Sequence, residues 1–390
     1  MTPSARAQAA IEVLDEVIAA ARTGGAAADT LIARYFAKRR YAGSADRRAV
    51  REHVYAAIRA LGEVPETGRA ALLGVLSEDE RATLFDGSAH GPQPCVAGEP
   101  VASTGLAPHW LVEALANSGI GRPEIAAMVD RAPLDIRVNR LLTDPDTIRA
   151  ELPEAAPIAH LPNGLRLPAG FDVAPMGGRV EVQDAGSQFV TMAAGAAPGM
   201  TFVDLCAGAG GKALAMAAAM GGEGKILACD IDRARLSRLL PRAALAGATI
   251  ITTRLLDPMR ELDVLDDWRA RADCVVIDAP CSGTGTWRRN PEGRWRLSAA
   301  MLGKLADTQA RLLGIGAALV RPGGSLVYVV CSLLDEEGSA QVARFCSANP
   351  GWHAAALSLP VGHERGGGVR LSPLQDSTDG FFVARLMAPC

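Results

Sequence analysis

Two cysteines in the second half of the chain combine a reactive side chain with a position suited to chemistry. Cys281 closes the stretch Asp278-Ala279-Pro280-Cys281 after the apolar run VVID, and Cys331 ends the run SLVYVVC. Both runs predict buried strands, so each thiol lies just past a strand end, at the same edge of a sheet. A cysteine is usually an inert small hydrophobe. The shared location instead favours a chemical role for these two thiols beside the Asp278 carboxylate.

The remaining cysteines and the histidines predict no metal or disulfide chemistry. The eight cysteines include no Cys-x-x-Cys pair, and the six histidines never fall at metal-ligand spacing. We therefore expect no disulfide framework and no structural metal, and cysteine usage fits a reducing cytoplasm. The thiols interpreted as small packing groups are those of Cys206, Cys229, Cys274 and Cys346.

A loop of small residues follows an earlier strand-like run and opens a helix. It reads Asp204-Leu205-Cys206-Ala207-Gly208-Ala209-Gly210-Gly211-Lys212. Small residues let the backbone approach a ligand closely, and the helix N-terminus offers unpaired N–H groups. Cys at position 206 and Ala at position 213 exclude a Walker phosphate loop, whereas Gly208 and Gly210 fit a relaxed dinucleotide fingerprint. The loop alone leaves the cofactor open.

Two more acids end strand-like runs. Asp230 closes KILACD, where a carboxylate can accept both hydroxyls of a ribose. NAD and S-adenosylmethionine both carry such a ribose, so Asp230 fits either. The alternative role is a helix N-cap, which Asp232 could fill instead. Asp257 closes ITTRLLD, and either borders an adenine or occupies a loop turn.

The elements that must position these groups alternate after residue 180. Strand-like runs are Thr201–Leu205, Lys225–Cys229, Thr249–Leu255, Cys274–Ile277, Ser325–Val330 and Phe381–Leu386. Helical runs are Lys212–Met220, Arg233–Leu245, Ala299–Leu319 and Glu336–Ala348. This alternation predicts an α/β fold with a doubly wound parallel sheet, and the last strand is a candidate antiparallel partner. Active sites of such sheets lie outside the carboxyl ends of the strands, where every motif above is found.

The first 180 residues have a different character. Residues 1 to about 75 predict helices, 86–105 predict a loop rich in Gly, Pro and Ser, and 131–175 predict a small α+β unit with a strand at LDIRVN. From Arg34 to Arg51 seven basic residues accompany one acid, Asp46. This cluster is either a solvated helix face or a surface that contacts phosphates.

A second basic stretch follows the Pro-Cys motif. Arginines there could hold phosphates while tryptophans stack on bases, or the tryptophans could simply pack in the core. The residues concerned are Trp287, Arg288, Arg289, Arg294, Trp295 and Arg296.

Composition excludes several protein classes. The 390 residues suggest two or three domains, and the 49% hydrophobic content is typical of a globular protein. With 40 basic and 43 acidic residues the net charge is −3, which excludes a uniformly basic coat. No apolar run is long enough for a membrane span, and the N-terminus lacks the apolar region of a signal peptide. We expect a cytoplasmic protein.

The motifs resemble those of a known family. DLCAGAGGK, ACDIDRARLSRL, DAPCSGTGTWRRNPEGRW, VCSLLDEEG and DGFFVARL are similar to the Sun (Fmu) family of RNA cytosine-5 methyltransferases. The resemblance implies a helical NusB-like RNA-binding domain at 1–125, a small α+β RRM-like segment at 126–178 and a Rossmann-like methyltransferase domain at 179–390. Two residues depart from the family pattern: Ala209 replaces a proline and Val330 replaces a threonine.

The resemblance also implies roles for residues. Cys331 would be the nucleophile that adds to a cytosine, Cys281 would help to remove the carbon-5 proton, and Asp278 would hold the base edge. Lys212 would lower a thiolate pKa or contact the base, or it would be a plain helix-start lysine. DNA cytosine methyltransferases place the nucleophile in the Pro-Cys motif, so residue type alone leaves the two cysteine roles open. The implied cofactor, S-adenosylmethionine, would be bound by Cys206, Ala207, Gly208, Ala209, Gly210, Gly211, Lys212, Asp230, Asp257 and Asp278.

The NusB-like similarity favours small-subunit (16S) ribosomal RNA as the substrate, with transfer RNA as an alternative. A Rossmann NAD(P) oxidoreductase would explain the glycine loop and Asp230, but not two cysteines at strand ends. A non-catalytic RNA-binding module is the alternative that is not an enzyme. We expect no metal and no membrane association, and we expect a monomer because a binder of large RNA needs no symmetric partner.

Overall fold

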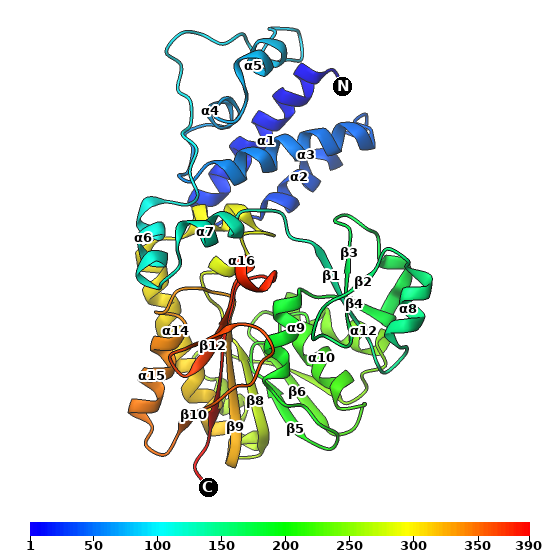
Figure 1. Ribbon diagram of the computed structural model, residues 1–390, viewed down its shortest axis with the longest axis vertical. Helices are drawn as coiled ribbons and strands as arrows, with labels where there is room; N and C mark the ends of the chain where they lie inside the picture. The colour runs from blue at the N-terminus through cyan, green and yellow to red at the C-terminus, as the bar shows by residue number, and fades with distance from the viewer. The chain divides into compact units, whose positions relative to one another are not determined.

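The computed structural model describes residues 1–390, which form two compact units (Figure 1). Unit 1 contains residues 1–131 and 286–298, and unit 2 contains residues 132–285 and 299–390. None of the helices is both long enough and apolar enough to span a membrane.

Unit 1 is helical. The buried side chains Leu14, Val17 and Ile18 of the first helix lie in the core of the unit, as their helical spacing predicts. This helix begins where the Thr2 hydroxyl accepts a hydrogen bond from the backbone N–H of Ala5, and it ends at Gly24 in a left-handed conformation. The helices of the unit are α1 (Pro3–Thr23), α2 (Ala28–Ala37), α3 (Ser44–Ala60), α4 (Gly68–Leu73), α5 (Glu78–Leu84), α6 (His109–Asn117) and α7 (Arg122–Met128).

The short segment 286–298 completes unit 1. Arg294 is fully buried, and its guanidinium donates to the carbonyl oxygens of Ile58 (2.5 Å), Arg59 (3.1 Å) and Leu61 (2.9 Å). These carbonyls lie at the C-terminal end of α3, where a helix lacks its own donors. The indole N–H of Trp295 donates to the same Leu61 carbonyl (3.1 Å). The segment therefore acts as a polar cap and a core element of the helical unit.

This burial corrects one interpretation of the second basic stretch. Trp287, Arg294 and Trp295 are all buried, so these tryptophans are not available to stack on bases. Arg296 donates to the carbonyls of Gly25 and Ala26, at 2.6 Å each. The alternative of core packing holds for both tryptophans, and the expected RNA surface is wrong at Trp287, Arg294 and Trp295.

Unit 2 begins with a small antiparallel sheet in the order β2-β3-β1-β4. Its elements are β1 (Leu134–Val138), α8 (Pro145–Glu151), β2 (Ala156–Pro157), β3 (Gly164–Leu167), a 3₁₀ turn η1 (Ala174–Arg179) and β4 (Val180–Val182). The strand expected at LDIRVN is β1.

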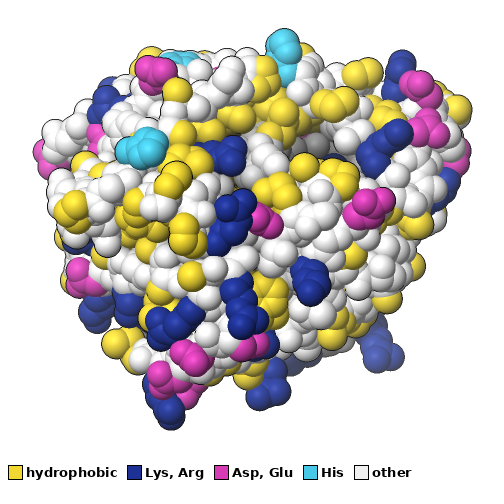
Figure 2. All heavy atoms as spheres, turned by 90° about the horizontal axis from the view of Figure 1, so that it is seen from below, with side chains coloured by type: hydrophobic (Ala, Val, Ile, Leu, Met, Phe, Trp, Pro, Cys, Tyr) yellow, Lys and Arg dark blue, Asp and Glu magenta, His cyan; other side chains and the backbone are white.

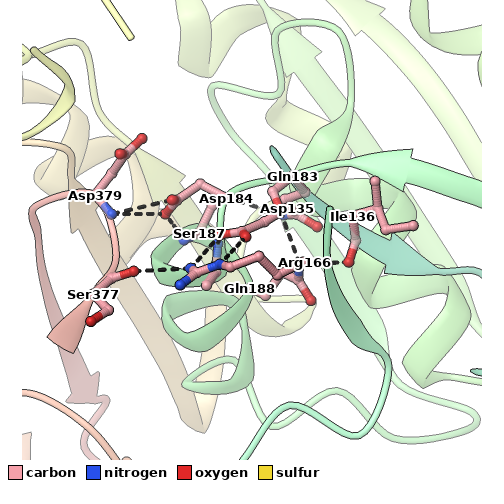
Figure 3. Close-up of polar contacts among 10 residues, drawn as sticks. Asp135, Ile136, Arg166, Gln183, Asp184, Ser187, Gln188, Ser377 and Asp379 are labelled. Atoms are coloured by element: carbon pink, nitrogen blue, oxygen red, sulfur yellow. Dashed lines mark hydrogen bonds and ion pairs between the residues drawn. The ribbon is translucent and has the colours of Figure 1, made fainter. Parts of the chain in front are cut away.

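The two residues of a partly buried ion pair in this sheet also bind the rest of unit 2 (Figure 3). Asp135 of β1 lies opposite Arg166 of β3 and accepts hydrogen bonds from its Nε (2.7 Å) and Nη2 (3.0 Å). The second Asp135 oxygen also accepts the backbone N–H of Ala185 (3.0 Å), the first residue of α9 (Ala185–Met192). Arg166 donates in addition to the carbonyl of Ser377 (3.0 Å). One carboxylate thus joins two strands and the N-terminus of a helix.

The main sheet has nine strands, and its principal order is β11-β12-β13-β9-β8-β5-β6-β7, with β10 paired to β13. Strands β5 to β9 pair in parallel, whereas β13 runs antiparallel to β9, as expected for the last strand. The doubly wound α/β fold is therefore confirmed. The strands are β5 (Thr201–Asp204), β6 (Lys225–Asp230), β7 (Ile251–Leu255), β8 (Ala272–Asp278), β9 (Val320–Val330), β10 (His353–Ala355), β11 (His363–Arg365), β12 (Gly368–Leu371) and β13 (Phe381–Met387).

The helices that connect these strands differ from the expected ones at two places. The expected helix 233–245 is divided in two, because Pro241 has no N–H to continue the helix from residue 237. The expected helix 336–348 begins only at Ser339, since Gly338 has non-helical dihedral angles. The helices are α10 (Gly211–Ala219), α11 (Arg233–Leu236), α12 (Leu239–Leu245), α13 (Glu261–Val264), α14 (Ala299–Leu319), α15 (Ser339–Ala348) and α16 (Pro373–Asp376), and the 3₁₀ turns are η2 (Asp266–Trp268), η3 (Thr284–Thr286) and η4 (Pro291–Arg296).

Charges of both signs are mixed on the surface. On the face drawn in Figure 2, Lys and Arg side chains lie beside Asp and Glu side chains. Exposed ion pairs such as Arg260–Asp263 and Arg269–Asp266 are of this kind, and such pairs contribute little to stability. The face in Figure 2 therefore offers no continuous basic surface to a polyanion.

Candidate active site

The predicted chemical residues meet at one edge of the main sheet. β5, β6, β8 and β9 end at Asp204, Asp230, Asp278 and Val330, and because these neighbouring strands are parallel, their carboxyl ends share that edge. A cavity of about 430 Å³ opens there. Its lining combines an apolar set, Leu205, Ile231, Leu256, Ala279, Pro280 and Leu312, with a polar set, Cys206, Asp230, Asp232, Arg235, Glu261, Asp278, Cys281, Thr308, Arg311 and Cys331.

The two cysteines lie side by side in this cavity. The sulfur atoms of Cys281 and Cys331 are 3.4 Å apart, too far for a disulfide and close enough for one thiol to donate to the other. The hydrogen bond with Cys331, then burial, then the negative charges of Cys331 and Glu337 raise the pKa of the Cys281 thiol well above its ordinary value. The expectation that both thiols share one sheet edge is confirmed.

A buried lysine brings a positive charge to the pair. Lys212, in the first turn of α10, forms an ion pair with Asp278 at 2.7 Å and is only 8% exposed. Burial lowers the pKa of Lys212, but the charge and the hydrogen bond of Asp278 outweigh it, so that the pKa is raised. The negative charge of Cys331 acts in the same direction. A plain helix-start lysine would instead extend into solvent.

Asp230 holds the glycine loop. Its carboxylate accepts the backbone N–H of Gly208 (2.7 Å) and of Asp232 (2.8 Å). Gly208 has a φ of 55°, and a Cβ there would come within 2.5 Å of the Arg235 guanidinium. Asp232 caps α11 by accepting from Ala234 and Arg235. The helix cap is therefore Asp232, and Asp230 is left to face the cavity.

Of the other residues expected to bind the cofactor, some line the cavity and some do not. Cys206 lines it, while Ala207, Ala209, Gly210 and Gly211 belong to the surrounding loop. The carbonyl of Ala209, the residue in place of the usual proline, accepts a hydrogen bond from Arg242. Asp257 follows β7, is exposed and does not line the cavity, whereas its neighbour Leu256 does.

Two buried acids of the site, Asp204 and Glu337, were not predicted from the sequence. Asp204 ends β5 with 1% exposure, and neither of its carboxylate oxygens has a hydrogen-bond partner. Burial and then the negative charge of Asp278 raise the pKa of Asp204 to about 7. Glu337 is fully buried behind Cys281. The position of Asp204 at a strand end was a usable signal, whereas nothing in the run DEEG distinguishes Glu337 from a solvated acid.

The cavity fits the expected cofactor. Its volume lies in the range of small-ligand sites, and the apolar set could enclose an adenine while Asp230 still has lone pairs for ribose hydroxyls. Four acids line the cavity, Asp230, Asp232, Glu261 and Asp278, against two cations, Arg235 and Arg311. This excess of negative charge favours a positively charged ligand such as a sulfonium.

Known proteins resemble this chain in sequence. A family model described as 16S rRNA methyltransferase RsmB/F matches residues 192–387, half of the chain. The probable ribosomal RNA small subunit methyltransferase B of Synechocystis sp. is 34% identical over 304 residues, covering 72% of this chain and 66% of the relative. Ribosomal RNA small subunit methyltransferase B of Xanthomonas campestris is 34% identical over 265 residues, 66% of this chain and 60% of the relative. The matched region thus spans slightly less than two thirds of these relatives.

Solved structures share the fold. The crystal structure of PH0851 superposes with a TM-score of 0.77 at 23% identity, covering 97% of this chain and 98% of that one. NSun6 from Pyrococcus horikoshii with SFG gives a TM-score of 0.64 at 19% identity, covering 72% and 98%. The family match over half of the chain confirms the resemblance of its motifs: the chain belongs to the 16S rRNA methyltransferase RsmB/F family.

Proposed function

We propose that this protein transfers a methyl group from S-adenosylmethionine to carbon 5 of a cytosine in small-subunit (16S) ribosomal RNA, through a covalent adduct with Cys331. The observation that carries the proposal is the pair of thiols 3.4 Å apart at the cavity, beside the Lys212–Asp278 ion pair. The names of the two relatives, both ribosomal RNA small subunit methyltransferases B, support ribosomal RNA as the substrate.

Cys331 begins the reaction. Carbon 5 of cytosine is too poor a nucleophile to take a methyl group unaided, so the Cys331 thiolate adds to carbon 6 and a sulfur–carbon bond forms. The electrons of the carbon 5–carbon 6 double bond move into the ring, and the ring nitrogen takes a proton from solvent. Asp278 stabilises this adduct by accepting hydrogen bonds from the exocyclic amino group and the protonated ring nitrogen. S-adenosylmethionine, when held at the cavity by Asp230, would supply an electrophilic methyl group to carbon 5, and its sulfur–methyl bond would break to leave S-adenosylhomocysteine.

Cys281 ends the reaction. Cys281 first gives its own proton to solvent and then, as a thiolate, takes the proton from carbon 5. The double bond re-forms, the bond between carbon 6 and Cys331 breaks to release the enzyme, and the ring nitrogen returns its proton to solvent. Lys212 stabilises the negative charge on Cys331 before attack and after release, because the two opposite charges attract each other. The target base must leave its stack or lie in a single-stranded loop to reach the cavity.

For the helical region 1–125 we propose a role in RNA binding. Arg34, Lys38, Arg40, Arg48 and Arg51 are exposed and form no ion pair, and we call these residues the α2–α3 basic surface. The one acid of that stretch is neutralised, because Asp46 is bound by Arg6 and by the N-terminal amine. Free cations at helical spacing can displace the counterions of an RNA backbone.

Two further assignments complete the proposal. We propose 126–178 as an RRM-like segment attached to the methyltransferase domain 179–390, a view supported by the hydrogen bonds from the backbone N–H of Ala185 to Asp135 and from Arg166 to the carbonyl of Ser377. The eight free cysteines are consistent with the reducing cytoplasm as the site of action. The monomeric state stays a prediction.

Single cysteine variants test the mechanism. We expect Cys281→Ala to accumulate a covalent protein–RNA adduct, visible as a band that resists denaturing gel electrophoresis, and Cys331→Ala to form none. Cys95→Ala, which changes an exposed thiol of unit 1, is the matched control and should behave as the unchanged protein. The reverse pattern, with the adduct in Cys331→Ala, would assign the nucleophile to Cys281 and overturn the proposal.

The cofactor and the RNA need separate tests. Calorimetry should detect binding of S-adenosylmethionine and none of NAD, and NAD binding alone would favour the oxidoreductase. Bisulfite mapping of cellular RNA with and without the protein should show one 16S cytosine that loses its methyl group. A lost site in transfer RNA would change the substrate, and no lost site would favour the non-catalytic module.

A further inference from the structure

Glu337 is a fully buried acid that the reaction described above does not use. It lies between β9 and α15, and its carboxylate accepts the backbone N–H of Ser282 (2.8 Å), the hydroxyl of Ser282 and the side-chain amide of Gln309 (3.1 Å). All three groups donate to Glu337 and none accepts from it. An ionised Glu337 satisfies all three groups at once, because a carboxylate only accepts hydrogen bonds.

The hydroxyls beside the two cysteines form a directional chain that ends on Glu337. Thr284 accepts the backbone N–H of Leu333 (3.0 Å), and its oxygen is 3.1 Å from that of Ser332. Ser332 is in turn 3.2 Å from Ser282, whose single proton is given to Glu337. With Glu337 ionised, the proton of each hydroxyl points along the chain, from Thr284 through Ser332 and Ser282 to the carboxylate. Such chains polarise their members and strengthen one another.

This network holds both reactive loops. Ser282 directly follows Cys281, and Ser332 directly follows Cys331, so their mutual hydrogen bond joins the two loops. The Gln309 amide bridges Glu337 and the carbonyl of Pro280 (3.0 Å), the residue before Cys281. The backbone is thus held on both sides of Cys281, which explains how the two sulfurs are kept within hydrogen-bond distance.

The charges around the pair are of opposite sign. Glu337 contributes a negative charge to the Cys281 side, where Tyr328 donates its hydroxyl to the Glu337 carbonyl (2.6 Å). Lys212, paired with Asp278, contributes a positive charge to the Cys331 side. The positive charge of Arg344 acts on Tyr328, whose pKa is nevertheless raised, first by burial and then by the negative charges of Cys281 and Glu337.

We propose that Glu337 is a positioning residue of the cysteine pair, which holds the two loops together and keeps the shared proton on Cys281, so that Cys331 is the sulfur that becomes a thiolate. This inference deepens the proposed function and rests on its assignment of the nucleophile. A negative charge beside Cys281 disfavours its thiolate, consistent with the raised pKa of that thiol. The same charge makes the Cys281 thiolate, once formed, the stronger base of the two.

Thiol reactivity without RNA or cofactor tests this assignment. The full-length protein is alkylated with iodoacetamide from pH 6 to pH 10, and the modification rates of Cys281 and Cys331 are read separately by mass spectrometry. In the unchanged protein we expect Cys331 to become reactive at lower pH than Cys281. The opposite order would overturn the proposal, whether or not any variant folds.

Glu337→Gln removes the charge and keeps the acceptor oxygen for Ser282 and Gln309. We expect the alkylation rate of Cys281 at pH 8 to rise about tenfold, the effect of roughly one pKa unit, with the Cys331 rate changed by less than about twofold. Ser282→Ala is the matched control, because it breaks the hydroxyl chain but leaves the carboxylate, and its Cys281 rate should stay near that of the unchanged protein. An unchanged Cys281 rate in Glu337→Gln, or an equal rise in Ser282→Ala, would refute the role of the charge.

The alkylation experiment can fail independently of the experiments that test the proposed function. Alkylation needs neither methyl transfer nor RNA, so a covalent RNA adduct in Cys331→Ala would refute the nucleophile assignment without altering the measured thiol order. Conversely, a reversed thiol order would refute the role of Glu337 even if Cys331 forms the adduct.

Discussion

Replacing Asp204 by Asn should change how the stability of unit 2 depends on pH. Asp204 ends β5, is 1% exposed, and has no hydrogen-bond partner for either carboxylate oxygen. Burial, followed by the negative charge of Asp278, raises its pKa from 3.8 to about 7. Asn has nearly the same shape and carries no charge at any pH, so it removes the ionisation while leaving the packing in place.

The size of the effect follows from linkage. In the folded protein the carboxyl group keeps its proton to about pH 7, whereas in the unfolded chain it loses the proton near pH 4. The free energy of unfolding therefore falls as the pH rises between these values, and levels off above pH 7. At about 1.4 kcal/mol per pKa unit, Asp204 should lower the free energy of unfolding by about 3 kcal/mol between pH 5 and pH 8. Asp204→Asn should lack this decrease.

Hydrogen exchange gives the stability of unit 2 separately from that of unit 1. Peptides covering β5 and β6 are followed by mass spectrometry through urea unfolding at pH 5 and pH 8, in the unchanged protein and in Asp204→Asn. Asp257→Asn, which alters an exposed acid past β7, is the control and should follow the unchanged protein. If the difference between Asp204→Asn and the unchanged protein is the same at both pH values, the reasoning from burial is refuted.

Two further predictions concern unit 1. Arg294→Met removes the donor to the carbonyls of α3, which then stay buried without partners, so we expect the free energy of unfolding of unit 1 to fall by about 3 kcal/mol. Hydrogen exchange of α1 and α3 measures this change. The exposed Arg48→Met is the control, and equal stability of the two variants would contradict the capping role. The double variant Arg40→Gln and Arg48→Gln should bind a 16S RNA fragment more weakly and lower the slope of log Kd against log salt concentration by about 1 to 2. An unchanged slope would show that these cations do not contact phosphates.

The site could be predicted largely because parallel strands bring their ends together. Apolar runs ending in Asp230, Asp278 and Cys331 predict buried strands, and the sheet topology then places these residues at one edge. The pairing of Lys212 with Asp278 could not be predicted in this way. The two residues are 66 positions apart, and only the packing of α10 against the sheet decides where the lysine points.

The interpretation of the segment 286–298 depended on information that composition does not contain. Arginine beside tryptophan suits an RNA surface, and it equally suits a guanidinium that satisfies buried carbonyls. Arg294 does the second, because the C-terminal end of α3 offers three carbonyls in one place. Likewise, the sequence around Glu337 suggests an exposed acid. Only the fold places the hydrogen-bonded hydroxyls of Ser282, Ser332 and Thr284 next to its carboxylate.

The late position of Arg294 has a consequence for synthesis in the cell. The carbonyl of Leu61 accepts a hydrogen bond from Arg294, which is synthesised 233 residues later. At about 5 to 20 residues per second, the ribosome needs roughly 10 to 50 s to deliver it. During that interval the nascent helices lack Trp295 from their core and the cap on α3. We therefore expect the emerging N-terminal helices to be a preferred substrate of chaperones until residue 298 has left the exit tunnel.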